Sequence, residues 1–206
     1  MPAEAMASFA GVGCHFDLAD LKDGEAVLDL GSGSGMDSFI AALTVGPRGT
    51  VVGLDMTDEQ RRKAERLRDR DSFGQVSYLS GPIDDIPCAD GTFDAVISNG
   101  VINLAVHKAQ VFKQVARVLK PGGRLAISDI VTERQLPDSI VCNATLWAAC
   151  IGGAMQQDNY CAALEAAGRE LVTVRDNPQY LFISDNARAA CEKFGVKSMS
   201  LLARRP

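Results

Sequence analysis

The sequence predicts an α/β fold: a doubly wound, mostly parallel sheet of seven strands with helices on both faces. Three observations support this prediction. Strand-like and helix-like segments alternate from Ala26 onward, a glycine-rich loop directly follows the first strand, and neither a Pro, Gly or Ser-rich linker nor an internal repeat interrupts the chain. We therefore expect a single domain over residues 1–206, with residues 1–24 as an N-terminal flap and residues 133–206 folded back onto the core.

The first half of the chain supplies four of the predicted strands, at residues 26–30, 50–56, 75–81 and 93–99. Helices are expected at residues 36–44, 58–70 and 107–120. Thr57 and Gln60 have the spacing of a capping box at the start of the second helix. The third helix carries one apolar stripe and should stop at Pro121; the stripe consists of Val111, Phe112, Val115, Val118 and Leu119.

The second half begins with a strand at residues 124–131, after which the alternation changes. A helical segment is expected around residues 138–150. It is followed by a helix at 159–168, a strand at 170–176, a short helix at 185–194 and a last strand at 196–203. Ligands of such a sheet bind outside the carboxyl ends of its strands.

Composition excludes several classes of function. The 21 basic and 26 acidic residues give a net charge of −5, and no basic stripe with interleaved aromatics is present, so we expect no nucleic-acid partner. The N-terminus does not resemble a signal peptide, and no apolar run approaches the roughly 20 residues that cross a bilayer. We expect a cytoplasmic monomer without a membrane partner.

The stretch LDLGSGSGMDSF is typical of a nucleotide-type site. It places Gly31, Gly33 and Gly35 between a strand and a helix, where the backbone can approach a ligand closely. Met36 stands where a dinucleotide fingerprint needs its third glycine, so that fingerprint is not met. Asp55, twenty residues after Gly35 at the end of the second strand, can accept hydrogen bonds from ribose hydroxyls.

This arrangement, with NGVINL and VLKPGG further on, resembles class I S-adenosylmethionine-dependent methyltransferases, which have a Rossmann-like sheet. The resemblance implies that the glycines lie against the methionine moiety, that an acidic residue binds the ribose, and that an asparagine lies near the amino-acid end of the cofactor. The cofactor-binding residues expected from it are Asp29, Gly31, Ser32, Gly33, Asp55 for the ribose, Met56, Ile83 and Asp84 for the adenine, and Asn99.

Within that class the chain resembles the arsenite methyltransferases. The matching runs are LDLGSGSGMDSF, VVGLDMTDEQ, SNGVINL, VLKPGGRLAISDI and LWAACIGGA, which together span most of the chain between Phe9 and Gly168. The pattern of Trp147, Cys150, Gly152 and Gly153 in the last run is the most selective of them. The resemblance implies methyl transfer from S-adenosylmethionine to trivalent arsenic, either arsenite or methylarsenite.

The six cysteines, at positions 14, 88, 142, 150, 161 and 191, lack zinc-like spacing, and a chain of this size needs no disulfide scaffold. The resemblance implies that Cys14, Cys150 and Cys191 bind arsenic(III), which as a soft centre prefers thiolates to oxygen ligands. The other three are expected to pack, although Cys142 lies about two helical turns from Cys150 and is the alternative third ligand.

A thiolate complex of arsenic keeps a lone pair that can attack the sulfonium methyl, so no general base is required. The two histidines, His15 and His107, are accordingly interpreted as surface or loop residues, and catalysis as positioning. The substrate is expected as a thiol complex, with a thiol reductant such as glutathione or thioredoxin as partner. In the folded chain, Cys150 and Cys191 should lie near each other at the carboxyl-end face, with Cys14 on a mobile flap.

Three features depart from the family pattern: no cysteine precedes Cys14, the sequence stops at Pro206 without a long extension, and Gln156 and Gln157 replace an aromatic pair. These departures leave the substrate range and the number of methyl transfers open. Two alternative functions also stay open. One is a methyltransferase of the same fold that acts on a small organic acceptor such as a quinone precursor. The other is a non-catalytic metalloid or thiol sensor.

Overall fold

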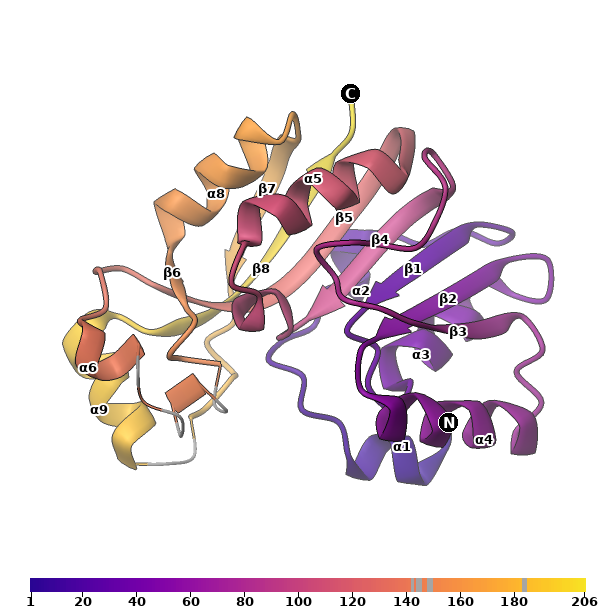
Figure 1. Cartoon of the computed structure of the whole chain (residues 1–206), viewed down its shortest axis with the longest axis horizontal. Coiled ribbons are helices and arrows are strands. Elements are labelled where there is room, and N and C mark those ends of the chain that lie inside the picture. Colours follow the sequence, from indigo (N-terminus) through magenta and orange to yellow (C-terminus); the bar gives the residue numbers. More distant parts are fainter. Residues whose placement is uncertain (142, 144–145, 148–149, 183–184) are drawn as a thin grey trace.

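A central sheet organises the computed structural model, which describes residues 1–141, 143, 146–147, 150–182 and 185–206. The strands follow the order β3-β2-β1-β4-β5-β8-β7 (Figure 1). Their bounds are β1 Ala26–Leu30, β2 Thr50–Asp55, β3 Val76–Ser80, β4 Phe93–Asn99, β5 Leu119–Thr132, β7 Glu170–Asp176 and β8 Lys197–Arg204. All pair in parallel except β8, which runs antiparallel to both β5 and β7. The predicted doubly wound, mostly parallel sheet is confirmed.

The described residues add an eighth strand to the seven that the sequence predicts. This strand, β6 (Met155–Gln156), pairs in parallel with the end of β5, where Val131 faces Met155. Two residues are too few to show an alternating pattern in the sequence, so the strand could not be predicted.

Helices cover both faces of the sheet. Helices α5 (Lys108–Val118) and α8 (Gln157–Ala166) lie over one face, and α2 (Phe16–Ala19), α3 (Met36–Val45) and α4 (Asp58–Arg70) lie over the other (Figure 1). Successive residues of β1 alternate between the two apolar clusters, with Leu28 and Leu30 under α5 and Val27 under α3. The predicted stripe of α5 is fully buried. This packing fixes the strand ends that carry the candidate site.

Two predicted details near helix ends are wrong. Strand β5 begins at Leu119, not at residue 124, because Leu119 pairs with Phe93 and the Gly122 and Gly123 backbones exchange hydrogen bonds with Arg205. Thr57 does precede α4, but its side chain makes no capping hydrogen bond. Its backbone N–H instead donates to Asp55 Oδ1 at 2.8 Å, so the capping box does not form.

A third apolar cluster lies beyond the carboxyl end of β5. It joins α6 (Asp138–Val141) and α9 (Asp185–Phe194) to the N-terminal segment through buried residues that include Val12, Ile130, Leu146, Ile151 and Ala190. The helical segment predicted at 138–150 corresponds to α6 and to helical backbone at Leu146 and Trp147. Cys142 lies outside the described residues.

The N-terminal segment packs against the sheet layer through short elements that the sequence did not predict, α1 (Ala3–Ala7) and α2. Glu4 pairs with Arg70 of α4, and the Ser8 and Ser34 hydroxyls lie 2.6 Å apart.

Of the two histidines, His107 is exposed as predicted. His15 is not a surface residue: it is fully buried and stacks on Phe16, and burial lowers its pKa to about 4. Among the described residues, no helix is both long and apolar enough to cross a membrane.

Candidate functional site

A cavity of about 300 Å³ lies at the carboxyl ends of β1, β2 and β4, where the strand order reverses. Its lining includes most of the predicted cofactor residues, namely Asp29, Gly31, Ser32, Gly33, Asp55 and Asn99, and also Cys150. Residues Ser8–Gly11 of the N-terminal segment complete one wall. Met56, which is 75 % exposed, Ile83 and Asp84 do not line this cavity in the present state. Their roles stay predictions.

The glycine loop has the conformation that its sequence predicts. Gly31 and Gly33 have φ values of +70° and +53°, a region that residues with a Cβ avoid. A Cβ on Gly31 would lie 2.4 Å from the Val101 side chain, whereas one on Gly33 would meet nothing within 4 Å. Gly31 therefore serves the packing of the loop, and Gly33 leaves space on the side of the loop that can receive a ligand.

Asp55 ties the end of β2 to this loop. One carboxylate oxygen accepts the Gly33 N–H at 2.9 Å, and the other accepts the Thr57 N–H at 2.8 Å. Each carboxylate oxygen has two lone pairs, so both retain an acceptor site. The residue can therefore hold the loop and a pair of ligand hydroxyls together.

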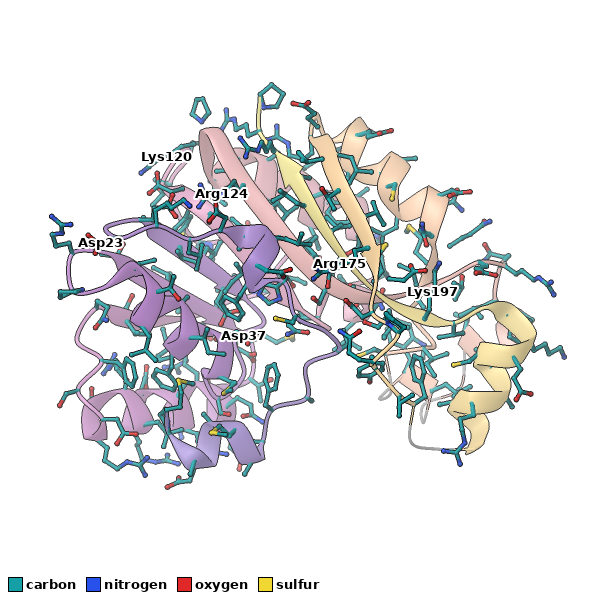
Figure 2. The ribbon with its side chains drawn as sticks, turned by 180° about the vertical axis from the view of Figure 1, so that it is seen from behind. Asp23, Asp37, Lys120, Arg124, Arg175 and Lys197 are labelled. Carbon is teal, nitrogen blue, oxygen red and sulfur yellow. The ribbon has the colours of Figure 1, made fainter. Side chains whose placement is uncertain are left out.

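Two buried carboxyl groups face the same cavity. Burial, with the charge of Asp37 second, raises the pKa of Asp29 to about 8, and Asp29 accepts a 2.6 Å hydrogen bond from Ser38. Burial also raises the pKa of Asp37, although the hydrogen bond that Asn99 donates to its carboxylate partly lowers this pKa (Asp37 is labelled in Figure 2). A cationic ligand group would offset the free-energy cost of burying these carboxylates in their ionised form, because it would supply an opposite charge beside them. Asp37 was not predicted from the sequence, although its place in the first helical turn after the glycine loop was a usable signal.

Asn99 connects the cavity to the N-terminal segment. Its Oδ1 accepts the Val12 N–H at 2.8 Å, and its Nδ2 donates to the Gly13 carbonyl at 3.1 Å and to Asp37 at 3.0 Å. Both donor hydrogens of the amide are used by the protein in this state. Asn99 thus holds the residues that directly precede Cys14.

Cys150 reaches the cavity from a tight turn. Its φ is +59°, and its thiol donates to the Gly100 carbonyl at 3.2 Å. Burial, followed by the nearby charge of Asp129, raises the pKa of the thiol to about 11. In this state Cys150 carries a protonated thiol and lines the ligand cavity.

The other two predicted arsenic ligands lie outside this cavity. Cys191, half-buried on α9, lines a neighbouring hollow of about 460 Å³ together with Tyr180, and both Cys150 and Cys191 pack against the third apolar cluster. Cys14 is exposed, and its carbonyl accepts hydrogen bonds from Arg175 and Ser200 (Figure 2 labels Arg175). In the described part of the chain, no three Cys, His, Asp or Glu side chains lie close enough to hold a metal ion.

The described cysteines are all free thiols. Cys88 is half-buried against the first apolar cluster, and Cys161 is half-buried on α8. Burial raises the pKa of both thiols. Neither lines the cavity of the glycine loop.

Comparison with known proteins places the fold and the sequence in one family. The family described as "Methyltransferase domain" matches residues 21–168. A solved arsenic(III) S-adenosylmethionine methyltransferase from Chlamydomonas reinhardtii is 30% identical, with a TM-score of 0.80 over 100% of this chain and 70% of that chain. The chain belongs to the arsenite methyltransferase family of S-adenosylmethionine-dependent methyltransferases.

Curated relatives of this chain agree with that placement. The arsenite methyltransferase of Halobacterium salinarum is 42% identical over 178 residues, which are 85% of this chain and 46% of the relative. That of Aquipseudomonas alcaligenes is 40% identical over 191 residues, 89% of this chain and 54% of the relative. The chain thus spans about half the length of the curated relatives it matches.

Proposed function

We propose that this methyltransferase transfers the methyl group of S-adenosylmethionine to trivalent arsenic bound by its cysteines. The observation that supports this most directly is that Cys150, whose thiol bonds the Gly100 carbonyl, lines the same cavity as Gly100 and the glycine loop. A methyl donor and a thiol-bound acceptor placed in the same cavity would be close enough to react. The names of the relatives from Halobacterium and Aquipseudomonas support arsenite as the acceptor.

The residues of the cavity suit the proposed cofactor. S-adenosylmethionine, when bound, supplies an electrophilic methyl group on a sulfonium centre. We assign its ribose hydroxyls to the open acceptor sites of Asp55, and its ammonium group to the buried carboxyls of Asp29 and Asp37. Ser32 and the Gly31–Gly33 backbone line the methionine side, with Asn99 beside it. Met56, Ile83 and Asp84 are proposed for the adenine.

Arsenic capture needs no base even though the pKa of Cys150 is high. When a thiol meets arsenous acid, an arsenic–sulfur bond forms, an arsenic–hydroxyl bond breaks, and the thiol proton leaves with the hydroxyl as water. Cys150 is the first ligand in this proposal because its thiol already faces the cavity. Cys191 and Cys14 would follow, which requires the segment around Cys14 to move inward.

The chain's contribution to the transfer step is positioning. Three thiol ligands leave the arsenic lone pair free, and the fixed turn of Cys150 sets its direction. The arsenic lone pair would form the bond to the methyl carbon while the carbon–sulfur bond of the donor breaks, and the electron pair of that bond would stay on the sulfur of the departing thioether. The arsenic product is then pentavalent. Its return to the trivalent state consumes two electrons, which two thiols supply by forming a disulfide; glutathione or thioredoxin is the proposed reductant.

The test is a methylation assay with purified protein, arsenite, glutathione and S-adenosylmethionine, followed by chromatographic speciation of arsenic. We expect methylated arsenic from wild type and from the control variants Cys88→Ser and Cys161→Ser, and at least a hundredfold less from Cys150→Ser, since a hydroxyl is a poor ligand for a soft centre. Cofactor binding without methylated arsenic in the wild type would refute arsenic as substrate and favour an organic acceptor.

A further inference from the structure

A largely buried polar network lies directly behind the Cys150 turn. At its centre is Asn103, whose side chain is inaccessible to solvent. Its backbone N–H donates to Asp129 Oδ2 at 3.2 Å, and its carbonyl accepts from Lys108 Nζ at 3.1 Å. Its side-chain Nδ2 donates to the Ile130 carbonyl and, at 3.3 Å, to the Cys150 carbonyl. Asn103 therefore joins β5 and α5 to the turn that carries the thiol.

The Cys150 turn needs such an anchor. A residue other than glycine with a φ of +59° is held in a sparsely populated conformation, which persists only where neighbouring contacts fix it. Among the described residues, the thiol makes one hydrogen bond, to the Gly100 carbonyl. The bond from Asn103 fixes the Cys150 carbonyl, on the other side of the same α-carbon.

The two glycines after Cys150 pack around the same anchor. A Cβ on Gly153 would lie 2.0 Å from the Asn103 carbonyl oxygen, and a Cβ on Gly152 would lie 2.6 Å from the Trp147 ring. No side chain fits at either position. The tryptophan, cysteine and glycine pattern is thus a turn folded closely over Asn103, which accounts for the glycines on packing grounds.

The anchor is itself rigid. Asp129 is fully buried and accepts hydrogen bonds from the Tyr160 hydroxyl and from two backbone N–H groups, those of Asn103 and Ile130. Lys108, almost fully buried, donates to two carbonyls, those of Asn103 and Ala105. Because these partners are inside the core, Asn103 can move only if the network breaks.

We propose that Asn103 is a positioning residue for Cys150: its side-chain amide fixes the left-handed turn and thereby directs the thiol into the cofactor cavity. The inference rests on the proposed function in that Cys150 is taken as the first arsenic ligand. Asn103 is not among the residues that line the cofactor cavity, and its bond to Cys150 goes to the carbonyl oxygen, so it acts through the backbone of Cys150.

The test replaces Asn103 by Leu, which keeps the branched shape and removes the donor. Arsenite affinity is followed by the emission of Trp147, the only tryptophan of the chain, and cofactor affinity by calorimetric titration. The variant loses the bonds to the Ile130 and Cys150 carbonyls, and only the second holds the turn. Loss of that bond should weaken arsenite binding about five- to tenfold, with cofactor affinity within twofold of wild type. Alkylation of Cys150 by iodoacetamide, measured by peptide mass spectrometry, should become several-fold faster as the turn loosens.

The matched control is Gln75→Leu, which removes a half-buried side-chain donor to the Ala42 carbonyl just before β3, outside the network around Asn103. It should lower the melting temperature while leaving arsenite affinity and Cys150 alkylation near wild type. Equal changes in both variants, or wild-type alkylation in Asn103→Leu, would overturn the proposal. If the Leu variant does not fold, Asn103→Ser, too short to reach the Cys150 carbonyl, takes its place.

Failure of the proposed function gives a different result. If arsenite binds equally to wild type and to Cys150→Ser, then arsenic is not a ligand of this thiol. The alkylation rates of the Asn103 and Gln75 variants still report whether Asn103 fixes the turn, because that measurement involves no arsenic.

Discussion

Removal of the Asp55 carboxylate should abolish most of the cofactor affinity. In the free protein this carboxylate accepts two backbone N–H groups, and its two remaining acceptor sites are available to the ribose hydroxyls. Hydrogen bonds to a charged group contribute about 1.5 kcal/mol or more each, so two of them amount to about 3 kcal/mol. A loss of that size raises the dissociation constant about 100-fold.

Asp55→Ala and Asp55→Asn separate the two duties of this side chain. Alanine removes the loop contacts and the ribose contacts together, so we expect the full loss of affinity with a lower melting temperature. Asparagine keeps one carbonyl acceptor and should lose about tenfold. Asp90→Ala, an exposed carboxylate paired with Arg117, is the control. Calorimetric titration with S-adenosylmethionine measures all four proteins, and wild-type affinity in Asp55→Ala would refute the ribose assignment.

Three further predictions concern the loop, its buried acid and the flap. Gly33→Ala should fold and bind the cofactor at least tenfold more weakly, since its methyl group enters the open space assigned to the ligand. Gly31→Ala should chiefly lower the melting temperature, because its Cβ meets Val101. Calorimetric titration and thermal melts separate the two effects. Burial raises the pKa of Asp29 to about 8, so the folded wild type loses stability as pH rises from about 4 to 8. An Asp29→Asn variant does not titrate, so in thermal melts its melting temperature should rise relative to wild type through this pH range. A melting-temperature difference that stays constant with pH would contradict this. Arg175→Gln should speed deuterium exchange around Cys14, because the guanidinium donates to its carbonyl; unchanged exchange would count against Arg175 as the anchor of the flap.

Much of the fold could be predicted because its signals are local. Helices α4 and α9 and strands β4 and β7 have the predicted bounds, since each has a clear period and a turn signal at its ends. The start of β5 could not be predicted, because Pro121 and the two glycines after it indicate a loop. Pairing with Phe93 and with the chain end, both distant in sequence, keeps that stretch extended.

The part of the candidate site that lies within one sequence motif could be predicted. The glycine loop and Asp55 lie within one strand-helix-strand unit, so their spacing in the sequence determines their meeting in space. Asp37 and Asn99 belong to different units, and the 3.0 Å bond between them depends on the register of β1 with β4. Spacing alone does not reveal such a contact.

The same reasoning explains why the resemblance identified Cys150 but not what holds it. A motif records which residue types recur near a site, and Trp147, Cys150 and the two glycines are contiguous in the chain. Asn103 lies 47 positions earlier, and its bond to the Cys150 carbonyl exists only because β5 brings Asp129 and Ile130 under the turn. The selective motif is therefore half of a structural unit whose other half is SNGVINL. A graft of the LWAACIGGA segment alone onto another methyltransferase sheet should leave the thiol free to rotate away from the cavity.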